Sequence, residues 1–226
     1  MHDPFDVRAL EGSALALRTL TLDADETATL AEQEHDVLLY VTRGSGLLAV
    51  GDDSASVGAR SAGLVLAGEE AALSATSELE ALVATIGPTT DLHAAMGARE
   101  LTVSLDDADA QQATSARSFQ ILFGPHNGST RATMFAGFIP PGKSPWHYHL
   151  YDEIVWIPDG PGRLHLAEGE SALDADAAFR LRPRQVHIVE NTGPAEMTII
   201  GIFTPAGSPS AAYLTADVAA EYRIAG

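Results

Sequence analysis

The sequence predicts an all-β protein that contains two similar β domains in tandem. Short segments with the apolar and polar alternation of strands recur along the chain, and glycine-rich turns separate them. The pattern also repeats, because Gly44 and Gly46 fall on Gly160 and Gly162 when the chain is shifted by 116 residues. Internal repeats of this kind indicate two copies of one structural unit. We therefore expect the same barrel scaffold to occur twice.

The first half contains five predicted strands, at residues 14–22, 37–42, 47–50, 63–66 and 79–86. The first of them alternates in hydrophobicity as a half-buried strand does. The second and third flank the turn sequence Arg43-Gly44-Ser45-Gly46, which is typical of a hairpin. We therefore expect these two strands to pair with each other.

A polar segment separates the halves. We assign residues 1–97 to the first domain, residues 98–115 to a linker and residues 116–226 to the second domain. Four strands are predicted in the second half, at residues 119–123, 133–139, 154–157 and 163–166. A short helix is expected over residues 91–99, and another over the tail at residues 215–224.

Composition excludes several classes of function. The chain has a net charge of -18 and a single lysine, Lys143, which argues against a nucleic-acid partner. There are 0 cysteines, so any metal must be bound by histidine, carboxylate or amide groups. No apolar run approaches the ~20 residues of a membrane span, and the N-terminus lacks the features of a signal peptide. A cytoplasmic protein without a membrane partner is expected.

The stretch from residue 140 to residue 162 carries the strongest chemical signal. It contains His147 and His149, which alternate as residues on one face of a strand do, and Glu153 follows four positions later. Two imidazoles and a carboxylate placed in this way are suited to a divalent metal ion. Tyr151, in the kink before Glu153, is expected to reach the mouth of the same pocket and is the candidate catalytic residue.

Together with a later segment, this stretch resembles the two signature motifs of the cupin superfamily. The first motif reads Gly142, His147, His149, Glu153 and Gly160, and the second reads Pro183, His187 and Asn191. The sequence departs from the family pattern by one residue fewer between Gly142 and His147, and by Gln185 where a glycine often stands. The resemblance covers about residues 116–206. It implies a double-stranded β-helix, or jelly-roll, barrel.

The resemblance also implies a ligand set for one divalent ion, which could be Fe, Mn, Ni, Co or Zn. The implied ligands are His147, His149, Glu153 and His187. The shift of 116 residues maps these positions onto residues of the first half that do not bind metals, namely Ala31, Gln33, Val37 and Ala71. We therefore interpret the chain as a bicupin with a degenerate, metal-free N-terminal domain.

Two polar residues near the motif receive other roles. If Gly160 closes a tight hairpin, His165 pairs near Ile154 and lies outside the pocket. Asp152 is a candidate hydrogen-bond partner of a ligand imidazole, because such outer partners are common at metal sites. Asn191 is expected to end a strand or to fix a turn.

The leading functional hypothesis is a metal-dependent enzyme acting on a small organic substrate, most favourably a dioxygenase-type oxidoreductase. The apolar residues near the motif favour a compact substrate, such as an aromatic or an enol/carbonyl compound. One alternative is an isomerase or lyase that uses the metal as a Lewis acid. Others are a non-catalytic metal- or ligand-binding protein and a protein whose metal is structural. A homodimer is expected from the resemblance alone.

Overall fold

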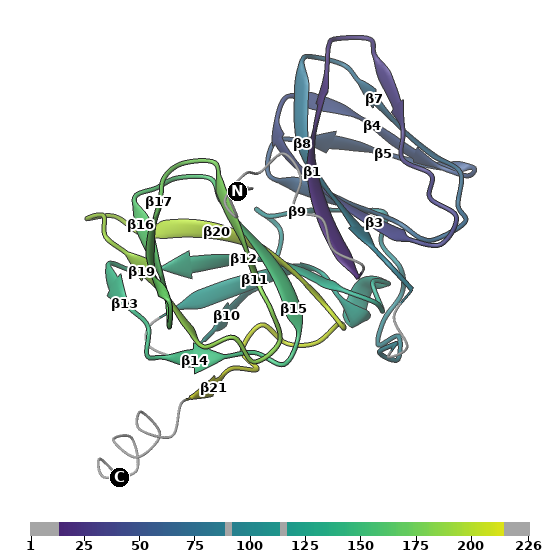
Figure 1. The fold of residues 1–226 in the computed structure, drawn as a ribbon. Helices are drawn as coiled ribbons and strands as arrows, with labels where there is room; N and C mark the ends of the chain where they lie inside the picture. Colours follow the sequence, from purple (N-terminus) through teal and green to yellow (C-terminus); the bar gives the residue numbers. More distant parts are fainter. Residues whose placement is uncertain (1–13, 89–91, 114–116, 215–226) are drawn as a thin grey trace.

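The protein is all-β, as predicted. The computed structural model describes residues 14–88, 92–113 and 117–214 (Figure 1). Within these ranges the only helix is a 3-10 turn at Pro125–Asn127, and the strands form four sheets. The described residues contain no helix of the length and apolarity that a membrane span requires.

The first half consists of two antiparallel sheets. The larger has the strand order β1 (Leu15–Leu22), β8 (Leu79–Ile86), β3 (Asp36–Arg43), β6 (Ser61–Val65) and β9 (Thr102–Ser104). The smaller has the order β2 (Thr27–Thr29), β7 (Ala71–Ala75), β4 (Ser45–Val50) and β5 (Asp53–Gly58). Leucine and valine side chains from both sheets form one buried cluster between them. This half is therefore a small sandwich with a filled interior.

The second half has the same organisation. One sheet has the order β10 (Ala110–Gln112), β11 (Ser118–Phe123), β12 (Thr133–Ile139), β20 (Met197–Thr204), β15 (Asp152–Ile157) and β18 (Ala177–Leu181). The other has the order β17 (Gly169–Leu173), β16 (Gly162–Leu166), β19 (His187–Asn191), β14 (His147–Tyr148) and β21 (Tyr213–Leu214), and β13 (Gly142–Lys143) also pairs with β19. The candidate metal motif lies on β14, on the loop that follows it, on β15 and on β19.

The strands of the two halves correspond along the repeat. The shift of 116 residues superimposes β6 on β18 and β7 on β19, with identical bounds. The strand order β1-β8-β3-β6 then corresponds to β12-β20-β15-β18. The boundaries at residues 97 and 116 stay a prediction. In the segment assigned as linker, β9 joins a sheet of the first half and β10 joins a sheet of the second.

The expected hairpin around Gly44 is wrong. β3 pairs with β6 and β8, whereas β4 pairs with β5 and β7 in the other sheet. Gly44 has φ +82°, and a Cβ there would lie 2.0 Å from the carbonyl oxygen of Glu78. This position therefore requires glycine, and the chain turns there from one sheet into the other. β3 is a central strand with β8 on one side and β6 on the other, and its residues 36–41 are all buried. Both neighbouring strands come from later segments of the chain and not from the adjacent β4. Because the four sheets are separate, neither half is a closed barrel.

The helix expected before the linker is also absent from the residues that the structure describes there, 92–99. The backbone amides of His93, Met96 and Glu100 instead donate to carbonyl oxygens of Thr130, Pro125 and Asn127, at 3.0, 2.7 and 3.1 Å. Long-range backbone pairing therefore replaces the local hydrogen bonds of a helix. The helix expected in the tail lies outside the described residues.

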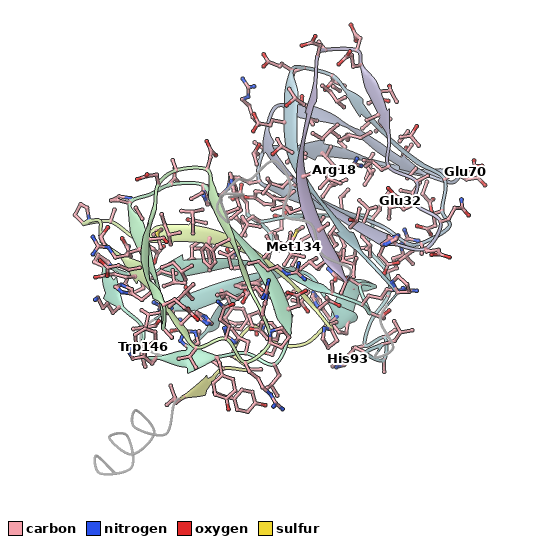
Figure 2. All side chains as sticks on the ribbon, in the orientation of Figure 1. Arg18, Glu32, Glu70, His93, Met134 and Trp146 are labelled. Carbon is pink, nitrogen blue, oxygen red and sulfur yellow. The ribbon has the colours of Figure 1, made fainter. Side chains whose placement is uncertain are left out.

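A hydrophobic cluster joins the two halves. Leu38 and Tyr40 of β3 belong to the same buried cluster as Ile154 and Trp156 of β15, and the Tyr40 and Trp156 rings are 6.4 Å apart. Met134 of this cluster lies where the halves meet in Figure 2. The outward face of one large sheet thus packs against that of the other, with β1 beside β15 (Figure 1).

Candidate metal centre

Three histidines from two strands and one loop meet inside the second half. His147 on β14 is directly opposite His187 on β19, and their ring centroids are 4.4 Å apart. His149 follows β14, with its ring 5.1 Å from that of His147 and 5.2 Å from that of His187. One nitrogen atom of each ring lies within 4.8 Å of the other two, so the three side chains could hold a metal ion.

The hydrogen bonds of the rings determine which nitrogen faces the centre. Nδ1 of His147 lies 2.8 Å from the carbonyl oxygen of Pro145, and Nδ1 of His187 lies 2.8 Å from that of Gln185. Nδ1 of His149 lies 3.3 Å from the carbonyl oxygen of Ala211. Because a carbonyl only accepts, each Nδ1 carries the proton and donates, which leaves the lone pair on Nε2. Three Nε2 lone pairs in one place fit a divalent cation.

Burial keeps these imidazoles neutral. Desolvation lowers the pKa of His149 to about 4 and that of His187 to about 3, and it also lowers the pKa of His147. The histidines are therefore unprotonated at neutral pH, which is the form that binds metals.

Glu153 lies beside this group at the start of β15. Its carboxylate oxygen Oε2 is 3.9 Å from Nε2 of His149, and the residue is 3% exposed. Burial, with the nearby charge of Asp152, raises the pKa of Glu153 to about 8. A buried carboxylate in this position is stabilised by a cation beside it. The assignment of Glu153 as the fourth ligand stays a prediction.

These shifts predict how stability depends on pH without metal. The histidines have folded pKa values below the ordinary 6.5, so they bind protons in the unfolded chain first, and stability falls as pH drops below about 6.5. Glu153 has a folded pKa of about 8, above the ordinary 4.5, so its contribution is lost as pH rises toward 8. Below about pH 6.5, the protonation of three histidines in the unfolded chain changes stability more than the ionisation of Glu153 does. Above that pH, only Glu153 changes stability.

We therefore expect the metal-free protein to be most stable near pH 6.5, with a loss of up to about 1.4 kcal/mol per pH unit on the alkaline side. Urea unfolding in EDTA at about pH 5.5, 6.5 and 7.5 measures this dependence. The matched control is Glu153→Gln, which should remove the alkaline decline. A wild-type stability that continues to rise above pH 6.5 would contradict the assignment.

Tyr151 lies in the cavity wall, as the sequence analysis expected of a pocket residue. Its ring is stacked between those of His149, at 4.6 Å, and Phe203, at 3.9 Å. Burial raises the pKa of Tyr151 above its usual range, so the hydroxyl stays protonated and can only donate its proton in a hydrogen bond or accept one through its lone pairs. Its catalytic role stays a prediction.

The cavity over the three histidines is mainly apolar. Its other lining residues in the described part of the chain include Phe119, Phe135, Phe138, Ile139, Val155, Leu181, Val189 and Ile199. Arg117, just before β11, also lines it and donates from Nη2 to the carbonyl oxygen of Val189 at 2.7 Å. Arg117 was not predicted from the sequence, because it lies 30 residues before His147 and belongs to no motif. The one available signal was the scarcity of basic residues in so acidic a chain.

His165 lies outside the cavity, and this prediction is confirmed. Its Nε2 is 2.7 Å from Glu190 and its Nδ1 is 3.2 Å from Glu170, and it does not line the cavity. The reason given for it was wrong, however. β16 pairs with β17 and β19 and not with β15, so His165 is opposite Ile188 and Glu170 and not near Ile154.

Two further residues near the motif have structural roles. Asp152 forms an ion pair with Arg180 instead of contacting an imidazole, which corrects that expectation. The Asn191 amide donates to the carbonyl oxygens of Ile139 and Ala195, at 2.8 and 2.7 Å, and accepts from the Gly193 amide at 2.9 Å. Asn191 therefore fixes the turn after β19, as expected.

The corresponding region of the first half is apolar. Val37 and Ala71, which occupy the positions of Glu153 and His187 in the repeat, belong to a buried cluster with Leu39, Leu48 and Leu73. Hydrocarbon side chains thus surround the positions that correspond to Glu153 and His187. A metal-free first half stays a prediction.

Comparison with known proteins identifies the fold. Residues 135–203 match the family model described as Cupin domain, and all four candidate ligands lie in this stretch. An oxalate decarboxylase from Bacillus subtilis, described with Mn(II) centres, is 13% identical with a TM-score of 0.72, covering 87% of this chain and 70% of that chain. No protein with a curated description matches the sequence.

Two more solved structures are similar. The formate complex of an oxalate decarboxylase from Lactobacillus farciminis is 11% identical with a TM-score of 0.75, covering 93% of this chain and 82% of that chain. A Cupin 2 conserved barrel domain protein from Leptotrichia buccalis is 14% identical with a TM-score of 0.62, covering 86% of each chain. Identities this low establish a shared fold and do not extend to shared chemistry.

Proposed function

We propose that the chain is a bicupin enzyme in which His147, His149, Glu153 and His187 bind one divalent metal ion. The observation that carries the proposal is the convergence of three Nε2 lone pairs in an apolar cavity, with a buried carboxylate beside them. The matching strand orders of the two halves support the interpretation as two cupin domains, the first of them degenerate. When bound, Fe, Mn, Ni or Co would supply redox or Lewis-acid chemistry.

The leading reaction class is oxidation of a small organic substrate by molecular oxygen, as in a dioxygenase. An isomerase needs a general base that is not a ligand. Apart from the four candidate ligands, the polar residues that line the cavity in the described ranges are Arg117, Ser118, Tyr151 and Ser210. Arg117 retains its proton, because its pKa is lowered only to about 10, and Tyr151 retains its proton because its pKa is raised. Neither can act as a base near neutral pH.

The second candidate is a lyase that decarboxylates its substrate. The Arg117 guanidinium beside the histidines favours this candidate, since a cation there would bind a carboxylate. Oxalate decarboxylases share the fold, although at 13% identity or less in the structures compared. The lyase candidate therefore rests on the residues that line the cavity. The similar structures only suggest which substrates to test.

The test measures oxygen consumption and product formation by protein loaded with Fe(II) or Mn(II). The panel contains phenols, enolisable ketones, aromatic carboxylates and oxalate. Oxygen uptake with an oxidised product, lost in His187→Ala but kept in His165→Ala, is the expected result. Carbon dioxide release without net oxygen uptake would favour the lyase. Ligand-induced melting shifts without any product would favour a binding protein.

Three expectations from the sequence remain predictions. These are a small-molecule substrate as the main partner, a homodimer and a cytoplasmic location. The metal-free first half is proposed to serve packing, because its apolar sheet face covers that of the second half.

A further inference from the structure

Arg117 brings a positive charge into the cavity of the candidate metal centre. Its side chain lines the same cavity as His147, His149 and His187, and it is partly buried. It is also the only arginine or lysine among the lining residues of that cavity that the structure describes. The cation therefore has a position from which it can contact a molecule bound beside the histidines.

This charge has no counter-ion among the described residues. No ion pair within 4.0 Å joins Arg117 to any carboxylate in the ranges that the structure covers. The described arginines 43, 60, 99, 131, 163 and 180 each have such a partner. Arg18, Arg182 and Arg184 also lack one, but they are exposed to solvent, whereas Arg117 is partly buried. Burying an unpaired charge is unfavourable, and a bound anion would offset that cost.

The guanidinium has donors to spare. It carries five N–H groups, and its hydrogen bond within the described chain goes from Nη2 to the carbonyl oxygen of Val189. That bond anchors the side chain on β19, next to the strand position of His187. The remaining N–H groups match the geometry of a carboxylate, which accepts two of them side by side.

The other residues of the cavity wall indicate which kind of group the substrate carboxylate is attached to. Aromatic and aliphatic side chains, among them Phe119, Phe135 and Ile199, form most of the wall. A second carboxylate placed against this wall, away from both Arg117 and the candidate metal ligands, would be buried without a counter-ion, which is unfavourable. A monocarboxylate with an apolar body would bury that body against the wall and place its charge on Arg117.

We propose that Arg117 binds the carboxylate of the substrate, and that the substrate is a compact monocarboxylate with an apolar body. This inference rests on the proposed function for the identity of the site, since it names the substrate class of the same cavity. Arg117 is then a specificity-determining residue. Its guanidinium favours an anionic substrate, and the apolar wall favours an apolar body attached to the carboxylate.

The experiment measures binding of benzoate and isobutyrate, and of their neutral amides, by isothermal titration calorimetry. It uses the full chain both metal-free in EDTA and loaded with Zn²⁺. The wild type is expected to bind each carboxylate at least about 10-fold more tightly than its amide. Arg117→Gln should weaken carboxylate binding by at least about 10-fold, equivalent to about 1.4 kcal/mol, and leave amide binding unchanged. Arg117→Lys should retain part of the preference, because it keeps the charge without the fork.

Arg163→Gln is the matched control, because Arg163 is an exposed arginine of the same half that pairs with Glu170. It should change neither binding constant. Equal loss of carboxylate and amide binding in Arg117→Gln would mean that Arg117 only supports the wall, and this would overturn the proposal. Failure of the wild type to bind either carboxylate would overturn it as well.

The two proposals fail in different ways. Loss of the proposed function appears as a wild type that takes up no metal. Calorimetric titration of the metal-free protein tests the assignment of Arg117 independently of metal uptake. Melting of Arg117→Gln provides the folding control, and its melting temperature is expected to stay at or above that of the wild type, since an unpaired buried charge is removed.

Discussion

Replacing His187 by alanine is expected to weaken metal binding at least about 100-fold. Loss of an outer partner of a ligand alone costs ~10–100-fold in affinity, so loss of a ligand should cost at least as much. His187 is 1% exposed, and its ring is close to both other imidazoles, at 4.4 Å from His147 and 5.2 Å from His149. Competition with a chelator of known affinity measures the change.

His165→Ala is the matched control. His165 is a buried histidine of the same half, with 8% exposure, but it pairs with Glu190 and Glu170 outside the cavity. Its replacement is expected to leave the affinity for metal unchanged, although the two glutamates lose a partner. If both variants lose metal to the same extent, the loss reflects a damaged fold and the assignment of His187 as a ligand is wrong.

Replacing Trp156 by alanine is expected to lower the free energy of unfolding by about 3–5 kcal/mol, the usual cost of deleting a large buried side chain. Trp156 is 6% exposed and packs on Tyr40 across the contact between the halves. The substitution therefore opens a cavity where the two large sheets meet. Denaturant unfolding measures the change.

The protein supplies its own control for this prediction. Trp146, the other tryptophan, is partly buried and lies far from the first half in Figure 2. Trp146→Ala is expected to cost clearly less, because fewer contacts are lost. A loss below about 1 kcal/mol for Trp156→Ala would show that the cluster between the halves contributes little to stability.

The repeat was the most informative feature of the sequence for the fold. Corresponding strands such as β6 and β18 have bounds related by the shift of 116 residues, because each half builds the same pair of sheets. The alternation of His147 and His149 likewise placed both rings in one cavity, since residues of that spacing share a face.

Strand pairing was not predictable from local signals. The glycines at 44 and 160 indicate a sharp turn correctly, but a turn signal does not say whether the next strand joins the same sheet. Both turns lead to the opposite sheet, because the preceding strands pair on both sides with segments that are distant in sequence. The helix expected near residue 95 failed for a similar reason, since its backbone bonds to residues 125–130.

The position of Arg117 in the cavity was likewise not predictable from local sequence signals. Its role depends on the chain before β11 reaching β19, where the guanidinium contacts Val189 across 72 residues of sequence. Motif spacing identifies residues that contact one ion from adjacent strands. It does not identify a residue that reaches the cavity from elsewhere.

The central claim is that one divalent ion is bound by His147, His149, Glu153 and His187. Anomalous diffraction from crystals of the Co²⁺-loaded protein tests it most directly. The account predicts one strong peak per chain, within about 2.0–2.2 Å of the three Nε2 atoms and of a Glu153 carboxylate oxygen, the distances found for borderline divalent metals. A peak elsewhere in the chain, or no peak between the three imidazoles, would contradict the account.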